Sequence, residues 1–255
     1  METSMINVIK RNGRGQEPLN LEKIHRMVEF ACDGLAGVSE SQVEMNANLQ
    51  LFDGISSEDI QEILIKSSND LISLDNPNYQ YVAARLLLYG LRKSVYGEHP
   101  DVRPHIVDHI NNCVEKKVYD EGIVKKYSDD EWEEIDGYID NDRDLLFTYA
   151  GLRQVADKYL VQDRSNGKVF ETPQQMYIMI AATLFADYPI ETRLDYVKRY
   201  YDSISRHKIN IPTPVMAGVR TPLRQFASCV LVDIDDTIDS IFSSDMAIGK
   251  YVAQR

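Results

Sequence analysis

Residues 212–232 read PTPVMAGVRTPLRQFASCVLV, and this stretch decides how we expect the end of the chain to fold. Four residues in it interrupt helical and strand patterns: Pro212, Pro214, Gly218 and Pro222. We therefore expect an irregular segment. The apolar run at 227–232 then predicts a short buried strand, and residues 237–252 have the spacing of a helix. A strand followed by a helix is how an α/β unit begins.

The first 97 residues predict a compact domain of four helices and a small sheet. Residues 7–11 form a strand pattern and precede Asn12-Gly13, a dipeptide that favours a tight hairpin turn. Asn20 and Ser56 stand where helix caps are expected. The expected helices are 21–35, 40–52, about 57–73, and one after Pro77 that ends before Gly97.

Residues 98–211 keep a mostly helical pattern. The expected helices are 104–117, 130–142, 145–159, 173–187 and 191–206. Asn166-Gly167 lies between two short apolar runs and predicts a hairpin. The fold class is therefore mainly α with small β elements, divided into domains at 1–97, 98–211 and 212–255.

The composition limits the classes of partner. The 255-residue chain has 28 Lys and Arg against 40 Asp and Glu, a formal net charge of -12, so we expect neither a nucleic acid nor a membrane partner. Its three cysteines are odd in number, widely spaced and without metal-ligand spacing, which favours a reducing cytoplasm over a secreted disulfide framework. The N-terminus lacks a signal-peptide pattern, and the most apolar run, 176–186, is about half the length of a spanning helix. We therefore expect a cytoplasmic protein.

Basic residues gather near the start of the first expected helix. Lys23 falls in its first turn, where a cation opposes the helix dipole unless an anion lies nearby. Lys10 and Arg11 on the preceding strand can add positive charge beside the same N-terminus, whose N–H groups suit an anion. Two interpretations stay open at this point: a phosphate site, or a solvated basic hairpin in which Lys23 pairs with a surface carboxylate.

Residues 8–13 (VIKRNG) and 17–24 (EPLNLEKI) resemble the start of an ATP-cone domain, and the resemblance covers residues 5–97. In that family a four-helix bundle capped by a small sheet binds ATP or dATP as an allosteric effector of overall activity. The resemblance implies that Lys10 and Lys23 contact the phosphates. It also implies that a wall around the nucleotide is formed by Glu17, Pro18, Leu19, Asn20, Leu21, Glu22 and Lys23.

Further positions follow from the same resemblance. Ser57 stands where the family has a hydroxyl contact, and Lys93 matches a further basic contact. Structural alternatives remain: Ser57 as support for a helix cap, Lys93 as a cation at a helix C-terminus, and Glu17 as an ordinary surface acid. Gln61 and Gly90 occupy positions where bacterial members carry histidines near the nucleotide. This departure weighs against inhibition by dATP, while ATP binding is still expected.

The stretch 212–229 resembles the large (α) subunit of class I ribonucleotide reductase, with departures at Leu223 and Ala227, where Thr and Ser are common. The resemblance implies that Cys229 is one of two active-site thiols that together supply two electrons to the ribose and end as a disulfide. A lone cysteine in an apolar setting is more often a packing residue, and this alternative holds for Cys229 as well. Cys32 and Cys113, on expected apolar helix faces, are interpreted as structural.

Nucleotide contacts are also implied near Cys229. Thr213 and Ser228 match positions that bind the nucleoside diphosphate substrate. Asp236, Thr237 and Ile238 match the specificity site, where a deoxynucleoside or nucleoside triphosphate effector binds near the α–α dimer interface, and the helix after them resembles one used for dimer packing. The alternatives are a turn role for Thr213, a small residue before a strand for Ser228, and an N-terminal cap for Asp236.

The resemblance covers only part of the reductase. Its catalytic domain is a ten-stranded α/β barrel, which one strand and one helix cannot close, so we expect a truncated chain or the N-terminal piece of a split subunit, inactive alone. The implied partners are the remaining C-terminal part of α, a β subunit that holds a diiron tyrosyl radical, and thioredoxin or glutaredoxin; no metal is expected in this chain. Two alternatives stay open: a non-catalytic ATP-binding regulatory module, and a remnant that binds nothing.

Overall fold

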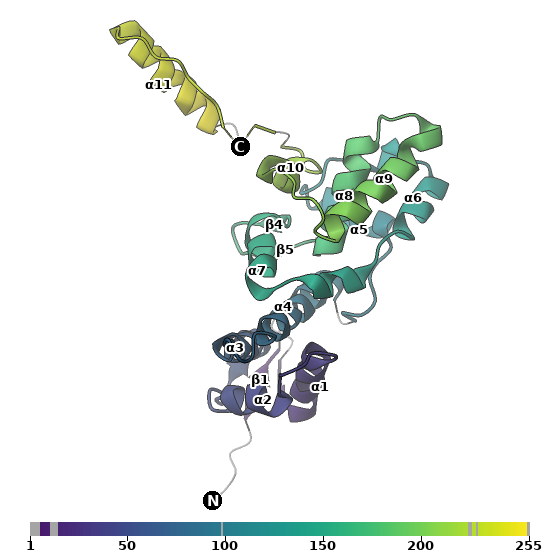
Figure 1. Cartoon of the computed structure of the whole chain (residues 1–255), viewed down its shortest axis with the longest axis vertical. Helices are drawn as coiled ribbons and strands as arrows, with labels where there is room; N and C mark the ends of the chain where they lie inside the picture. Colours follow the sequence, from purple (N-terminus) through teal and green to yellow (C-terminus); the bar gives the residue numbers. More distant parts are fainter. Residues whose placement is uncertain (1–5, 11–14, 98, 224–225, 228, 254–255) are drawn as a thin grey trace, which may run out of the picture. The chain divides into compact units, whose positions relative to one another are not determined.

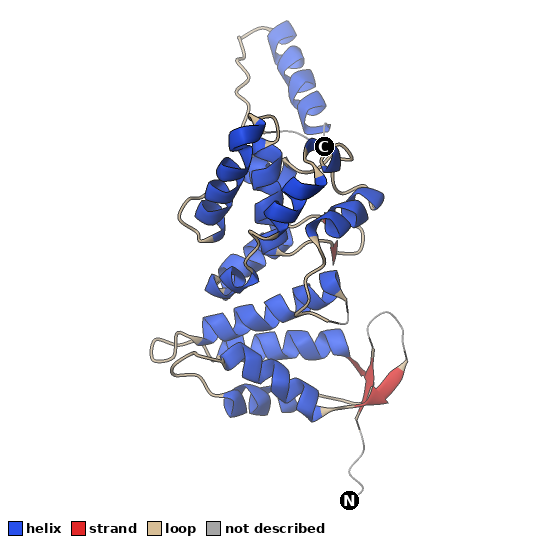
Figure 2. Cartoon of the chain, turned by 90° about the vertical axis from the view of Figure 1, so that its right-hand side faces the viewer, coloured by secondary structure: helices blue, strands red, loops and turns tan. Residues whose placement is uncertain are grey.

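The structure is a computed structural model that describes residues 6–10, 15–97, 99–223, 226–227 and 229–253. The described residues are mostly helical, with short strands, as Figure 1 and Figure 2 show. The chain divides into two compact units, residues 1–105 with 139–175 and residues 106–138 with 176–255. Each unit has its own core.

The first unit contains β1 (Asn7–Ile9), β2 (Gln16–Pro18), α1 (Leu21–Cys32), α2 (Glu40–Asn48), β3 (Ile55–Ser56), α3 (Ser57–Asp70), α4 (Tyr79–Tyr96), the 3-10 helix η3 (Asn141–Leu146), α7 (Tyr149–Lys158), β4 (Gln162–Asp163) and β5 (Lys168–Val169). Strand β1 is the middle strand of a three-stranded sheet, antiparallel to β2 and parallel to β3. β4 and β5 form the expected hairpin, in which Gly167 takes the positive φ that the turn requires. The four helices α1–α4 and the small sheet are the elements expected for residues 1–97, and the compact unit that contains them also includes residues 139–175.

Local signals set the helix starts in this unit. The side-chain oxygen of Asn20 accepts a hydrogen bond from the Lys23 amide at 3.2 Å, and the Ser56 hydroxyl accepts one from the Asp59 amide at 2.9 Å. Both caps are confirmed; each satisfies a helix N–H that has no partner within the helix. Apolar residues at helical spacing then form the core, which includes the fully buried Val28, Leu64, Val82, Leu86 and Leu88.

A buried polar network joins the last part of α4 to η3. The Arg92 guanidinium lies 3.3 Å from the Asp144 carboxylate and donates a 2.6 Å hydrogen bond to the Asn141 carbonyl oxygen. The Gln174 amide nitrogen donates to the other Asp144 oxygen at 2.8 Å. Burial raises the pKa of Asp144 to about 6, against the opposing effect of Arg92. The network therefore fixes α4 against residues that follow it by about fifty positions.

The second unit contains α5 (Ile106–Glu115), the 3-10 helix η2 (Val124–Lys126), α6 (Asp129–Asp136), most of α8 (Pro173–Phe185), α9 (Ile190–Ser205), α10 (Thr213–Gly218) and α11 (Ile238–Ala253). Residues 176–182 of α8 are all buried, although they lie on every side of the helix. A helix that is apolar all round is a core helix. The most apolar run of the sequence is thus the centre of this unit, and none of the described helices is long and apolar enough to cross a membrane.

An ion pair connects α6 to α9. The Arg193 Nε donates to a Glu131 carboxylate oxygen at 2.6 Å, and the guanidinium carbon lies 4.5 Å from the centre of the Tyr127 ring. The same carboxylate accepts a hydrogen bond from the Ser128 amide at 2.8 Å and completes a capping box at the start of α6. The Arg193 hydrogen bond is the main reason that the pKa of Glu131 lies below its usual range.

The expected buried strand at 227–232 is wrong. The described residues of this run have no strand, and Leu231 is 99% exposed. A strand needs a neighbour to accept and donate its backbone hydrogen bonds, and the described part of the chain offers it none. The expected irregular segment contains α10, whose second residue, Pro214, lies in the first turn, where an N–H is not needed. The expected Asn12-Gly13 turn lies outside the described residues.

Replacing Leu64 with alanine tests the core of the first unit. Leu64 is fully buried on α3, which packs on α4, so Leu64→Ala should lower the free energy of unfolding by about 2–5 kcal/mol. Urea unfolding followed by circular dichroism measures the loss. Leu74→Ala is the matched control, because Leu74 is fully exposed and its truncation should cost at most about 0.5 kcal/mol. Equal losses of unfolding free energy in the two variants would contradict the burial of Leu64 in this core.

Candidate nucleotide-binding and redox sites

Two lysines and one glutamate form a cluster where β2 leads into α1. The Lys10 ammonium lies 2.7 Å from one oxygen of the Glu17 carboxylate, and the Lys23 ammonium lies 3.1 Å from the other. The lysine side chains are 42% and 64% exposed, so a ligand can reach both. Hydrogen bonds from Lys10 and then from Lys23 lower the pKa of Glu17. The structure thus brings together both residues expected to contact phosphates.

The sheet register brings a further expected residue to the same end. Ile9 on β1 pairs with Ser56 on β3 in parallel register, so the next residues, Lys10 and Ser57, leave the sheet side by side. Ser57 is the first residue of α3, and the cap of that helix is Ser56. The helix cap that was considered as the structural role of Ser57 is therefore made by Ser56.

The rest of the expected wall follows from the end of β2 into the first turn of α1: Pro18, Leu19, Asn20, Leu21 and Glu22. Asn20 faces the helix it caps, and the Leu19 amide donates to the Ile6 carbonyl oxygen at 2.8 Å. Glu22 is exposed and pairs with Arg26 at 2.9 Å. The first turn of α1, the positive end of the helix dipole, therefore carries Lys23 and follows directly on the strand that carries Glu17.

Lys93 is exposed in the last turn of α4, a position that also fits its structural alternative as a cation at a helix C-terminus. Gln61 and Gly90, the two departures from the family, face each other between α3 and α4. The Gln61 amide donates a 2.6 Å hydrogen bond to the Leu86 carbonyl oxygen, and a Cβ on Gly90 would lie 3.4 Å from the Gln61 side chain. Gln61 therefore fills the space that Gly90 leaves, beside a cavity of about 310 Å³.

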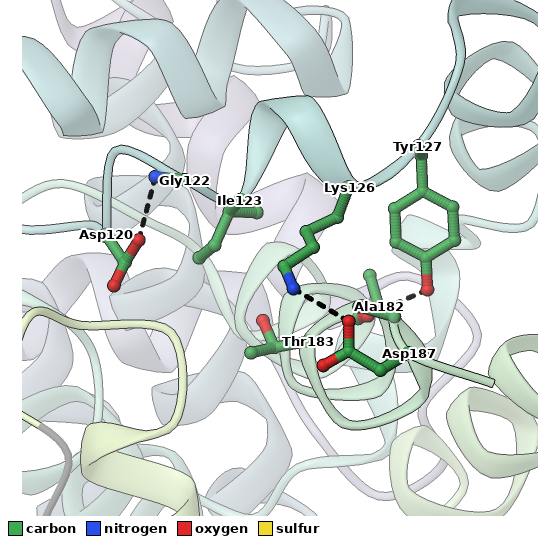
Figure 3. Close-up of a pocket in the computed structure, with 9 residues that line it drawn as sticks. Asp120, Gly122, Ile123, Lys126, Tyr127, Ala182, Thr183 and Asp187 are labelled. Atoms are coloured by element: carbon green, nitrogen blue, oxygen red, sulfur yellow. Dashed lines mark hydrogen bonds and ion pairs between the residues drawn. The ribbon is translucent and has the colours of Figure 1, made fainter.

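A smaller pocket of about 80 Å³ in the second unit was not expected from the sequence (Figure 3). Lys126 and Asp187 form a 2.7 Å ion pair beside it, and the Tyr127 hydroxyl donates to the Ala182 carbonyl oxygen at 2.8 Å. These polar groups satisfy one another. Within the described residues, moreover, there is no cluster of His, Cys, Asp or Glu that could hold a metal ion.

The three cysteines lie in different environments. Cys32 and Cys113 are buried, which agrees with their structural interpretation, and burial raises the pKa of Cys32 to about 11. Cys113 lies 3.7 Å from a ring nitrogen of His109. Cys229 is exposed, so the expectation that it is buried in a strand is wrong. Cys229 therefore lies at the surface, unlike the other two cysteines.

The other expected residues near Cys229 are only partly brought together. Thr213 is the first residue of α10 and half-buried, and Ser228 lies outside the described residues. The Thr237 hydroxyl accepts from the Ser240 amide at 3.2 Å at the start of α11, so the helix cap proposed for Asp236 is made by Thr237. Asp236 and Ile238 are exposed on either side of it.

Comparison with known proteins adds to this geometry. The model of the ATP cone domain matches residues 6–94, and that of the all-alpha domain of ribonucleotide reductase matches residues 145–224. The chain is 51% identical over 248 residues to the ribonucleoside-diphosphate reductase subunit alpha of Haemophilus influenzae, and 50% identical over 248 residues to ribonucleoside-diphosphate reductase 1 subunit alpha of Escherichia coli. The chain is therefore similar to the N-terminal region of class I ribonucleotide reductase α subunits, and it carries an ATP cone domain and an all-alpha reductase domain.

The similarity concerns only the N-terminal portion of the reductase subunits. The two alignments cover 97% of this chain and 32% of each relative, so the chain spans about a third of the length of the reductase subunits it matches. The subunit alpha of Enterobacteria phage T4 is 40% identical over 251 residues. The resemblance to the ATP cone and to the reductase α subunit is thus confirmed.

The sequence did not indicate that one carboxylate serves both lysines. Lys23 was expected to meet either a phosphate or a surface carboxylate, and in the structure its partner is Glu17, a residue of the expected nucleotide wall. The phosphate site and the surface ion pair would thus use the same residues, Lys23 and Glu17. The signal was hidden because Glu17 and Lys23 are six positions apart on a strand and a helix, a spacing that matches no single period.

Alkylation of the native chain tests the exposure of Cys229. Iodoacetamide at neutral pH should label Cys229 first, because its thiol is exposed while Cys32 and Cys113 are buried. Mass spectrometry of peptides gives the rate at each cysteine. Labelling in urea is the control and should reach all three cysteines. Equal native rates at the three positions would contradict the described environments.

Proposed function

We propose that this chain supplies the N-terminal part of the α subunit of a ribonucleoside-diphosphate reductase, which converts ribonucleoside diphosphates to deoxyribonucleoside diphosphates for DNA synthesis. The observation that carries the proposal is the alignment of 97% of the chain with reductase α subunits at about half identity. The chain contributes an ATP cone, part of the specificity site and one redox thiol. A second chain, or a longer form of this one, supplies the remainder, and the assembled enzyme is cytoplasmic.

The cone binds ATP or dATP as an allosteric effector. Lys10 and Lys23 take the phosphates beside the N-terminus of α1, and Ser57 leaves the sheet next to Lys10. Lys93 on α4 adds a further cation. The packing of Gln61 against Leu86 over Gly90 supports a response to dATP that differs from that of members with histidines at these positions.

The redox step uses Cys229 and a second cysteine of the completed subunit. The two thiols are oxidised to a disulfide and release two electrons and two protons, while the ribose 2′-carbon is reduced and its hydroxyl leaves as water. Thioredoxin or glutaredoxin then reduces the disulfide. Thr213 and Ser228 bind the nucleoside diphosphate, and a β subunit with a diiron tyrosyl radical initiates the reaction. The exposure of Cys229 supports its access to a partner thiol.

A specificity effector, a dNTP or ATP, binds at Asp236, Thr237 and Ile238, next to an α–α dimer contact made by α11. The apolar residues of α11 support this assignment, because Phe242 is 68% exposed and Met246 is exposed as well. A contiguous apolar helix face on a soluble chain is typical of an interface.

A second candidate function is a regulatory module that senses ATP without catalysis. One observation favours it: the cone has a complete core and a formed lysine cluster, whereas the segment around Cys229 has no strand in its described residues. A complementation assay distinguishes the two functions.

Removal of either lysine should weaken ATP binding. Lys10→Met and Lys23→Met each delete one of the cations proposed for the phosphates, and each should raise the Kd for ATP at least about tenfold. Isothermal titration calorimetry on the full chain measures it. Lys116→Met is the matched control, since Lys116 is an exposed lysine paired with Glu115 in the other unit. An unchanged Kd in both lysine variants would contradict the phosphate site.

Activity in the assembled enzyme should require Cys229. The chain is co-expressed with the C-terminal two thirds of a related α subunit and assayed for CDP reduction with β subunit and thioredoxin. Cys229→Ser should abolish turnover, because an alcohol cannot form the disulfide that supplies the electrons. Cys32→Ala, a change at a buried cysteine of the cone, should retain it. Turnover that survives in Cys229→Ser would exclude the redox role, and ATP binding without turnover in the wild-type assembly would favour the regulatory module.

A further inference from the structure

The Glu17 carboxylate is placed where it competes with a phosphate. Its two oxygens lie 2.7 Å and 3.1 Å from the ammonium groups of Lys10 and Lys23, the distances that a phosphate oxygen would take. Glu17 occupies the middle of β2 and pairs with Val8 on β1. The pairing of β2 with β1 therefore fixes the place of Glu17 in the sheet.

The same carboxylate reduces the electrostatic repulsion between the two lysines when no ligand is bound. Lys23 lies in the first turn of α1, where its charge adds to the positive end of the helix dipole, and Lys10 adds a second charge. A single negative group shared by both lysines offsets this repulsion. The protein thus carries its own anion at the helix N-terminus, and an incoming phosphate meets that anion before it meets free lysines.

We propose that Glu17 is an internal competitor for the nucleotide phosphates: it holds Lys10 and Lys23 in the nucleotide-free protein, and a ligand binds by taking both lysines from it. This proposal rests on the proposed ATP site. A ligand with one phosphate gains little from the exchange, because it replaces one anion with another. A triphosphate has charge enough to engage both lysines and the α1 N-terminus together. Glu17 therefore makes the site selective for the triphosphate over the monophosphate.

The opposite role for Glu17 makes the opposite prediction. A glutamate that accepts hydrogen bonds from the ribose hydroxyls of the nucleotide would strengthen binding, and its removal would weaken ATP without affecting inorganic polyphosphate. A competitor acts on phosphates alone. Tripolyphosphate and adenosine, the two halves of the ligand, therefore separate the two roles.

The test is calorimetry on the full chain without magnesium, with ATP, AMP, tripolyphosphate and adenosine. Glu17→Gln keeps the shape of the side chain and removes its charge, and Glu17→Ala removes both. Each variant should bind ATP and tripolyphosphate about three- to tenfold tighter than the wild type, since two exposed ion pairs no longer oppose the ligand. Binding of adenosine should not change, and the preference for ATP over AMP should shrink. Glu29→Gln, which removes the same charge further along α1, should bind as the wild type does.

Three results would overturn the proposal. Tripolyphosphate binding that is unchanged or weaker in both Glu17 variants excludes a competitor, and weaker ATP binding with unchanged tripolyphosphate identifies Glu17 as a ribose ligand. In both cases the ATP site itself stands, because the wild type binds ATP. If the wild-type chain and all variants bind neither ATP nor tripolyphosphate while circular dichroism shows them folded, the ATP site fails together with the competitor.

Discussion

The first unit depends on the burial of one helix, α4. It packs against α1 and α3 of the cone and also against α7 and η3, which follow much later in the chain. Leu86 and Leu88 are fully buried in it, and Arg92 is held by the buried Asp144. Removing either partner of such a pair leaves an uncompensated charge in the interior, so the position of α4 is strongly constrained. Lys93 follows Arg92 directly, and its place on the surface is thus fixed by an ion pair inside the protein.

The cluster of Lys10, Glu17 and Lys23 depends on a smaller constraint, the register of a short sheet. β1 pairs with β2 on one side and with β3 on the other, and these pairings bring Lys10, Glu17 and Ser57 to the N-termini of α1 and α3. The charges are arranged by backbone hydrogen bonds and are exposed to solvent. Such a cluster contributes little to stability, but it concentrates charge beside the N-terminus of α1.

The segment around Cys229 is not held by a core or by a sheet in its described residues. Up to α10 the chain is tied to the second unit, since the buried Arg220 donates to the Met216 carbonyl oxygen at 2.6 Å and its own carbonyl accepts from Asp120. The described residues beyond it, 226–227 and 229–235, have an apolar sequence but neither strand nor core. Apolar residues are buried only where neighbours surround them, and the described residues give this segment few such neighbours.

By itself the sequence determined the helical class, the caps at Asn20 and Ser56, the hairpin at Gly167 and the resemblance to reductase α subunits. These depend on neighbours within a few positions or on motifs read directly. Only the tertiary structure decided that Glu17 bridges two lysines, that Arg92 meets Asp144, and that the apolar run at 227–232 lacks a strand among its described residues. Each of these depends on which residues, distant in the sequence, lie opposite one another. An ion pair or a paired strand forms only when its partner lies next to it. The sequence around one residue does not specify which distant residue that partner is.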